Sequence, residues 1–235
     1  MNTCPVCSTK NHHLNVTCSA CGGYVQGRVD NLDLFSTIWR LIENPRRMFL
    51  SISLARYKNY STIVPAIAGI GLVFMLFWFI KAGDYTPSAL NLLAGATVLG
   101  PAVGVVTLLV LAGGVFLFLT LARVTVRFRN LYAVLAYAFV PVMLSVFFIL
   151  PLVIFSFGRY FFSMNPPPWL IKPVSYYVFL GLGAVIVGWT LTLLYTGMRV
   201  LLDCRWKTAA GIVSGIAAFL FGAAFLVRSI LGAGG

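Results

Sequence analysis

Long apolar runs separated by short charged or turn-forming segments dominate the chain from residue 63 onward. A helix rises about 1.5 Å per residue, so a hydrocarbon core of about 30 Å needs about 20 apolar residues. Five runs of this size occur, and they predict membrane spans at about 63–80, 98–122, 131–157, 174–198 and 208–231. The pattern therefore predicts an all-α membrane protein whose five-helix transmembrane bundle occupies residues 61–235.

Two of the predicted spans contain helix-breaking residues. The apolar stretch from Ser88 to Ala122 is longer than one crossing needs, and Gly100-Pro101 within it predicts either a kink or a break after a short interfacial helix. The third span contains Pro141 and Pro151. Proline is tolerated in a membrane bundle because neighbouring helices can satisfy the freed carbonyl groups.

The segment 28–60, just before the first span, alternates apolar and basic positions at steps of three and four residues. This period predicts two amphipathic helices lying on the membrane surface. Asn44 followed by Pro45 suits an N-cap and a first helical residue, so we expect the second helix to begin there. Alternatively, these two helices pack against the bundle or against the N-terminal segment. The expected membrane-surface residues are Trp39, Arg40, Arg46, Arg47, Phe49, Arg56 and Lys58.

The 17 lysine and arginine residues lie unevenly around the predicted spans. Seven precede the first span, three lie in the loop 123–129, and Arg199, Arg205 and Lys207 lie on that same side; only four lie on the other. Cytosolic segments of membrane proteins carry the excess of positive charge. The bias predicts a cytosolic N-terminus and, with five spans, a C-terminus on the outer side.

Composition excludes several classes of function. A hydrophobic content of 60% with only 9% charged residues excludes a soluble globular protein. None of the five predicted spans contains an acidic residue or a histidine, the groups on which ion and proton relays depend. The chain also lacks a catalytic triad, a carboxylate pair and a phosphate-binding loop. We therefore expect a protein that is not an enzyme.

Four of the five cysteines form two CxxC pairs, Cys4 with Cys7 and Cys18 with Cys21. Two such pairs can supply four thiolates to one tetrahedral zinc ion, and a closed Cys₄ set is typical of a structural site. Residues 1–27 are thus predicted to form a zinc ribbon with one structural zinc per chain. His12 and His13, which lie between the two pairs, are expected to be solvated loop residues and not ligands. In the first pair, Ser8 stands where a glycine would be usual.

The partners of the ribbon follow from its surface residues. It offers only Lys10 and Arg28 as basic residues, and few aromatics besides Tyr24. A nucleic-acid surface needs several phosphate contacts, so nucleic acid is disfavoured and a protein partner is favoured.

Two glycine pairs in the predicted spans, Gly100 with Gly104 and Gly211 with Gly215, are typical of close helix packing. We expect these glycines to bring helices of one bundle together. Alternatively, they form the contact between two chains of a homo-oligomer.

Two segments resemble the Yip1 domain family: residues 38–49 (IWRLIENPRRMF), and the stretch from Arg127 to Pro141 with its Tyr-Ala step before a proline. The resemblance covers residues 34–231 and implies a five-span bundle with a cytosolic N-terminus. Eukaryotic members act in vesicle traffic between endoplasmic reticulum and Golgi and contact Rab-type GTPases. This chain has a ribbon in place of their long cytosolic N-terminus, which is similar to prokaryotic members. The family brings no catalytic residues.

Together these features predict a noncatalytic membrane scaffold or adaptor in a bacterial inner membrane. Its partners would be the lipid bilayer and an unidentified protein bound by the N-terminal region. A permease or an accessory subunit of a membrane transporter is the alternative, and a membrane-tethered regulator whose ribbon contacts nucleic acid is a third class. Acidic residues or histidines at membrane depth would favour a transporter, and the predicted spans contain neither.

Overall fold

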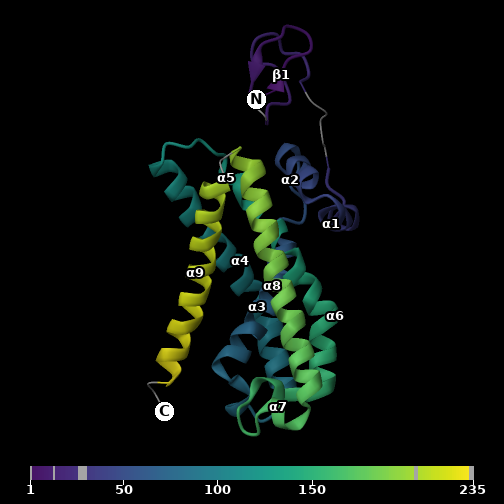
Figure 1. The fold of residues 1–235 in the computed structure, drawn as a ribbon, viewed down its shortest axis with the longest axis vertical. Coiled ribbons are helices and arrows are strands. Elements are labelled where there is room, and N and C mark those ends of the chain that lie inside the picture. Colours follow the sequence, from purple (N-terminus) through teal and green to yellow (C-terminus); the bar gives the residue numbers. More distant parts are fainter. Residues whose placement is uncertain (1, 13, 26–30, 204–205, 233–235) are drawn as a thin grey trace.

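The computed structural model describes residues 2–12, 14–25, 31–203 and 206–232 (Figure 1). His13 and Arg28 of the predicted ribbon and Arg205 of the predicted cytosolic side lie outside this part of the chain. The described elements are β1 (Asn2–Thr3), β2 (Lys10–Asn11), α1 (Leu34–Glu43), α2 (Pro45–Leu54), α3 (Ile63–Ile80), η1 (Ala82–Asp84), α4 (Ala89–Leu121), α5 (Phe128–Ala138), α6 (Val140–Phe157), η2 (Gly158–Phe162), α7 (Pro168–Ile171), α8 (Pro173–Leu202) and α9 (Trp206–Gly232).

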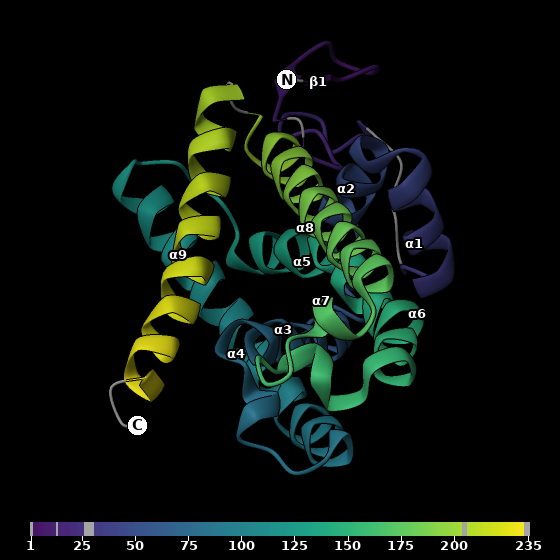
Figure 2. The same cartoon turned by 60° about the horizontal axis from the view of Figure 1, so that its bottom comes forward.

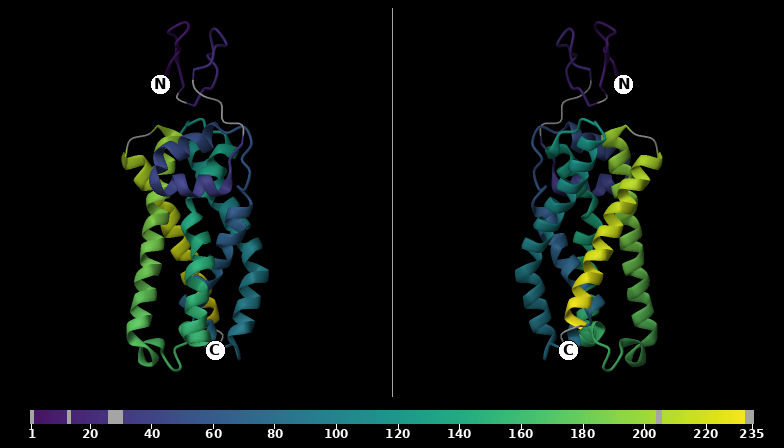
Figure 3. Two further views of the ribbon diagram at one scale, coloured as in Figure 1. Left: turned by 90° about the vertical axis from the view of Figure 1, so that its right-hand side faces the viewer. Right: turned by 90° about the vertical axis from the view of Figure 1, so that its left-hand side faces the viewer.

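Within the described residues, five helical segments are long and apolar enough to cross a membrane. They are Ile63–Ile80, Ala89–Leu121, Phe128–Phe162, Pro173–Leu202 and Lys207–Ile230. The prediction of an all-α membrane bundle is confirmed. The segments run side by side along the long axis of the molecule, while α1 and α2 lie across one end (Figure 3).

The second span differs from its predicted limits. Helix α4 begins at Ala89, not near residue 98, and continues through Pro101 without a break. Its start is fixed by Ser88, whose hydroxyl accepts a hydrogen bond from the Asn91 N–H at 3.2 Å. The helix therefore occupies nearly the whole apolar stretch from Ser88 to Ala122, which is longer than one membrane crossing needs.

The third span consists of two helices, α5 and α6, which meet at Phe139. Pro141 has no N–H for the Tyr137 carbonyl, and its ring crowds that carbonyl, so the helix is interrupted there. Helix α5 is nonetheless the centre of the main core: Leu131 and residues 133–138 are all buried. It packs against α2, α3, α4, α6 and α8 and lies between them in the view from the far end (Figure 2).

Helices α3 and α4 are in backbone contact through glycines. A Cβ atom added at Gly104 would lie 2.0 Å from the Pro65 carbonyl oxygen, and one at Gly69 would lie 2.0 Å from the Gly100 oxygen. This is the packing within one bundle that the sequence predicted for Gly100 and Gly104.

The glycines of α9 are different. Around Gly211, Gly215 and Gly222 an added Cβ would meet no described atom within 4 Å. The prediction that these small residues pack inside the bundle is therefore wrong for α9, whose glycine face is open. Its buried positions are Ala209, Ile212, Val213 and Ile216.

The end of the bundle opposite the ribbon carries α7 and the last turns of α9 (Figures 1 and 3). There Asp84 joins two connections: its carboxylate accepts hydrogen bonds from the Ser163 hydroxyl and from the N–H groups of Met164 (3.0 Å) and Asn165 (3.2 Å). Arg159 adds a bond to the Thr86 carbonyl at 3.0 Å. Side-chain polar contacts thus hold the α3–α4 connection against the α6–α7 connection.

Candidate metal centre and membrane-surface region

Each CxxC pair folds as a tight turn around its first cysteine. The carbonyl oxygen of Cys4 accepts the Ser8 N–H at 3.0 Å, and the carbonyl oxygen of Cys18 accepts the Gly22 N–H at 3.0 Å. Ser8 and Gly22 occupy equivalent positions, and both are left-handed, with φ of 58° and 71°. The turn therefore demands the conformation that glycine adopts freely, and Ser8 adopts it as well.

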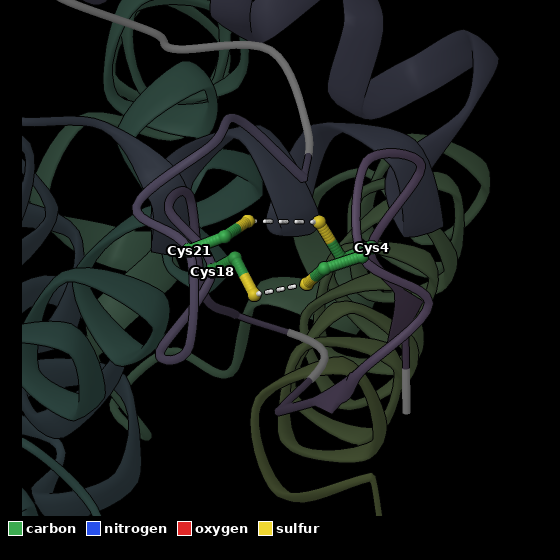
Figure 4. A group of neighbouring side chains, drawn as sticks. Cys4, Cys18 and Cys21 are labelled. Carbon is green, nitrogen blue, oxygen red and sulfur yellow. Dashed lines mark hydrogen bonds between the residues drawn. The ribbon is translucent and has the colours of Figure 1, made fainter.

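The two turns bring four sulfur atoms together. The Sγ atoms of Cys4 and Cys21 lie 3.7 Å apart, those of Cys7 and Cys18 lie 3.5 Å apart, and all four lie within 4.8 Å of one another (Figure 4). Tetrahedral coordination with metal–sulfur bonds of about 2.3 Å requires sulfur–sulfur separations of about 3.8 Å. The four cysteines are therefore placed to hold one metal ion.

Hydrogen-bond donors surround Cys18 and favour its ionised form. The backbone N–H groups of Cys21 and Ala20 and the Asn11 side-chain amide point at its sulfur, and they lower the pKa of Cys18 to about 6. Metals bind the thiolate and not the thiol. These donors are the outer layer expected around a metal-binding sulfur.

Asn11 connects the two halves of the site, and the sequence analysis missed it. This residue is 3% exposed. Its amide nitrogen donates to the Thr9 carbonyl at 2.9 Å and to the Cys18 Sγ at 3.4 Å, while its side-chain oxygen accepts from the Ser19 N–H at 2.9 Å. Cysteine spacing does not reveal such a residue, because Asn11 forms hydrogen bonds to a predicted metal ligand and is not itself a ligand.

Outside the four cysteines, the described ribbon offers little polar chemistry. The ring of His12 accepts the Leu14 N–H at 3.3 Å, which makes it part of the loop between the turns. Tyr24 is exposed. Leu14 packs against the main buried apolar cluster, which extends from Leu32 through α1 and α2 into the bundle.

The amphipathic segment forms two helices joined at Asn44. The Asp33 carboxylate caps α1 by accepting the Ser36 N–H at 2.8 Å, and the Asn44 side chain caps α2 by accepting the Arg47 N–H at 3.3 Å. Pro45 is the first residue of α2. The predicted start of the second helix is confirmed.

Helix α1 carries an exposed apolar face made of Phe35, Trp39 and Ile42, which are 81%, 63% and 49% exposed. These positions are separated by four and three residues, so they share one side of the helix. The Trp39 indole N–H donates to Glu43 at 2.7 Å. Four of the predicted surface arginines are exposed: Arg40, Arg46, Arg47 and Arg56.

Two of the predicted membrane-surface residues make their contacts within the protein. Phe49 is fully buried, because α2 packs on α5 and α8, and its ring lies directly against Gly197. Lys58 is partly buried, and its ammonium group donates to the carbonyl oxygens of Ile52, Ser53 and Ala55. Lys58 therefore caps the C-terminal end of α2, where the last carbonyls of a helix need donors.

Five apolar helical spans, with an amphipathic helix pair across one end, define a polytopic membrane protein, and the four-cysteine cluster beyond that end could hold a metal ion. The chain belongs to the Yip1 domain family, whose model matches residues 39–227. Proteins of this family are generally noncatalytic membrane proteins. Comparisons with curated proteins and with solved structures give no match.

Proposed function

We propose that this protein is a noncatalytic membrane scaffold or adaptor that recruits a protein partner through its N-terminal region. The observation that supports this proposal is the position of the four-cysteine cluster, which precedes residue 39, where the match to the Yip1 domain begins. A metal-bound ribbon adds a rigid surface outside the bundle, and such a small fold needs the metal to be stable.

The metal is proposed to be zinc, one ion per chain, held by Cys4, Cys7, Cys18 and Cys21. Four thiolates leave no open coordination position for a substrate or water, which is the arrangement of structural and not catalytic zinc. The ion would keep the two turns together, and the surface of the ribbon would then be available for a partner.

The ribbon end of the bundle is proposed to face the cytosol of a bacterial inner membrane. The α4–α5 connection, which carries Arg123 and Arg127, and the last turn of α8, which carries Arg199, lie at the same end of the bundle as α1 and α2 (Figure 1), in agreement with the charge bias of the sequence. Helix α1 would lie in the headgroup region with Phe35, Trp39 and Ile42 toward the acyl chains. Each arginine that reaches an anionic surface would contribute about 1 kcal/mol of attraction.

A transport role needs a path through the bundle. The break between α5 and α6 borders a cavity lined by Pro65, Ala68, Leu72, Gly104, Thr107, Leu108 and Phe139, and its volume is about 10 Å³. That is room for about one water molecule. This cavity therefore has no room for a solute larger than water.

The experiment that tests the proposal compares the intact protein with Cys18→Ser/Cys21→Ser, both purified in mild detergent without added metal. Elemental analysis should find about one zinc per intact chain and almost none in the variant. Proteins that copurify with the intact chain should be lost from the variant at equal membrane yield. Equal zinc content in both proteins would contradict the assignment of these cysteines as zinc ligands. Equal recovery of the copurifying proteins would show that the ribbon does not recruit them.

A further inference from the structure

The side chains of Arg129 and Lys58 and the backbone of Arg56 come together where the α2–α3 connection passes the start of α5. Arg129 donates a hydrogen bond from its guanidinium group to the Arg56 carbonyl, which brings residues 73 positions apart into contact. Lys58 is close enough to Arg129 for the two charges to repel. We call Arg56, Lys58 and Arg129 the basic triad.

The positive charge of the basic triad has no counterpart in the described protein. Among the described residues no carboxylate forms an ion pair with Arg56, Lys58 or Arg129, and Arg129 is the charged group that acts on the pKa of Lys58. Burial, with a smaller contribution from Arg129, lowers the pKa of Lys58 to about 8. An anion beside these groups would relieve the repulsion.

The triad also retains hydrogen-bond donors for such an anion. The ammonium group of Lys58 is occupied by three carbonyl groups, so it contributes charge. Arg56 is exposed with its guanidinium group 5.4 Å from the centre of the Tyr57 ring, and Arg129 is exposed and uses one nitrogen on the Arg56 carbonyl. A guanidinium group has five N–H donors in a fork that matches phosphate oxygens.

The location of the triad indicates the source of the anion. Lys58 lies shortly before Ile63, the first residue of the first span, and Arg129 lies in the first turn of α5, which opens the third span. Phospholipid phosphates lie at the level where apolar spans begin. A lipid therefore presents its phosphate at this position continuously, which a dissolved anion does not.

We propose that the basic triad binds the phosphate of an anionic phospholipid, with Arg56 and Arg129 as donors and Lys58 as a fixed positive charge. The site joins the α2–α3 connection to α5, and its occupant would brace the centre of the ribbon end of the bundle. This inference goes beyond the adaptor role and does not depend on which partner the ribbon recruits.

The test titrates the full-length protein in detergent with phosphatidylglycerol and follows thermal unfolding, with native mass spectrometry to count bound lipid. We expect a saturable rise in the unfolding temperature and one tightly retained lipid per chain. Phosphatidylcholine and millimolar inorganic phosphate should produce neither effect. The same rise with phosphatidylcholine would contradict recognition of anionic lipid, and the same rise with inorganic phosphate would contradict the lipid as occupant.

Variants locate the effect on the protein. Arg56→Gln changes an exposed side chain and leaves the carbonyl that Arg129 uses, so it should fold and should bind the lipid about fivefold more weakly. Arg56→Gln/Arg129→Gln should lose saturable binding, and Arg56→Lys should retain most of it. The matched control is Arg40→Gln/Arg47→Gln, which removes two exposed arginines of α1 and α2: it should weaken the diffuse attraction to anionic lipid and keep the one saturable site with wild-type affinity. Loss in the control equal to that in the triad variant would overturn the site.

Discussion

At the residue scale, the metal centre depends on side chains and conformations that flank the cysteines. Gly22 has a positive φ, and an added Cβ would meet no described atom within 4 Å, so a substitution there acts through backbone conformation alone. We expect Gly22→Val to weaken zinc binding about tenfold, since a left-handed conformation costs a residue with a Cβ about 1–2 kcal/mol.

Competition with a chromogenic chelator would measure this affinity. Ser8→Gly is the matched control, because it places glycine at the equivalent position of the other turn and should bind zinc at least as tightly as the wild type. An unchanged affinity for Gly22→Val would show that the turn does not need its left-handed residue.

Asn11 provides a second prediction at this scale. Asn11→Leu would keep a buried side chain of similar size and remove the donor to Cys18 and the acceptor for Ser19. Loss of outer partners of a metal ligand usually costs 10–100-fold in affinity, and we expect a loss in that range by chelator competition. Lys10→Gln, at the exposed neighbouring position of β2, should have no effect. Equal affinities in the two variants would refute the connecting role of Asn11.

Asp84 gives a pH dependence at the far end of the bundle. Partial burial by itself raises the pKa of Asp84, but the Ser163 hydroxyl and the N–H groups of Met164 and Asn165 outweigh it, and the pKa is lowered overall. Stabilisation by Asp84 is therefore present above its unfolded pKa of about 3.9 and is lost as the pH falls through the lower folded value.

Thermal unfolding in detergent between pH 7 and pH 3 would test this dependence. The wild type should be more stable than Asp84→Asn at pH 7, and the difference should shrink as the pH approaches 3. A difference that grew on acidification would mean that the carboxylate is not the favoured form in the folded protein.

At the scale of elements, the sequence predicts a helix best where both of its ends carry chemical signals. The limits of α3 agree with the prediction because polar residues precede Ile63 and Lys81 follows Ile80. The predicted start of α4 is wrong because the apolar stretch is longer than one crossing needs, so its composition does not show where the helix begins. The break at Phe139 was missed because Pro141 was treated as a residue that a continuous helix tolerates.

Helix packing supplies the prediction at this scale. Gly104→Ala should destabilise the bundle, because the new Cβ would lie 2.0 Å from the Pro65 carbonyl oxygen and would force α3 and α4 apart. We expect a loss of about 2 kcal/mol or more, typical of overpacking against rigid backbone. Gly215→Ala is the control, since its face of α9 is open.

Unfolding in a mixed-micelle denaturant series would compare the two variants. Gly215→Ala should match the wild type within about 0.5 kcal/mol. Equal destabilisation of both would mean that α9 packs its glycines in the solubilised protein.

At the scale of the whole molecule, local patterns predict the bundle and the cysteine cluster but not the contacts between distant segments. The spacing of the cysteines is sufficient to predict that Cys4 and Cys21 meet. No periodicity relates Arg129 to Arg56, and nothing in the amphipathic pattern shows that Phe49 and Lys58 make their contacts within the protein. Those facts depend on how α2 packs against α5 and α8.

The orientation of the molecule is a prediction at this scale. Reporter fusions after residue 231 should indicate an outer C-terminus, and fusions in the loop 123–129 should indicate the cytosol, because thirteen basic residues lie on the ribbon side and four on the other. A cytosolic C-terminus would mean that one of the five apolar helices does not cross the membrane.

The most direct measurement of the central claim, that the bundle is a self-sufficient membrane domain and the ribbon recruits, is deletion of residues 1–27. The truncated protein should insert and elute as a monodisperse peak like the wild type, because helix packing satisfies the bundle internally. It should also lose the proteins that copurify with the intact chain. Stoichiometric recovery of the same proteins with the truncated chain would contradict the account and place the recruiting surface in the bundle.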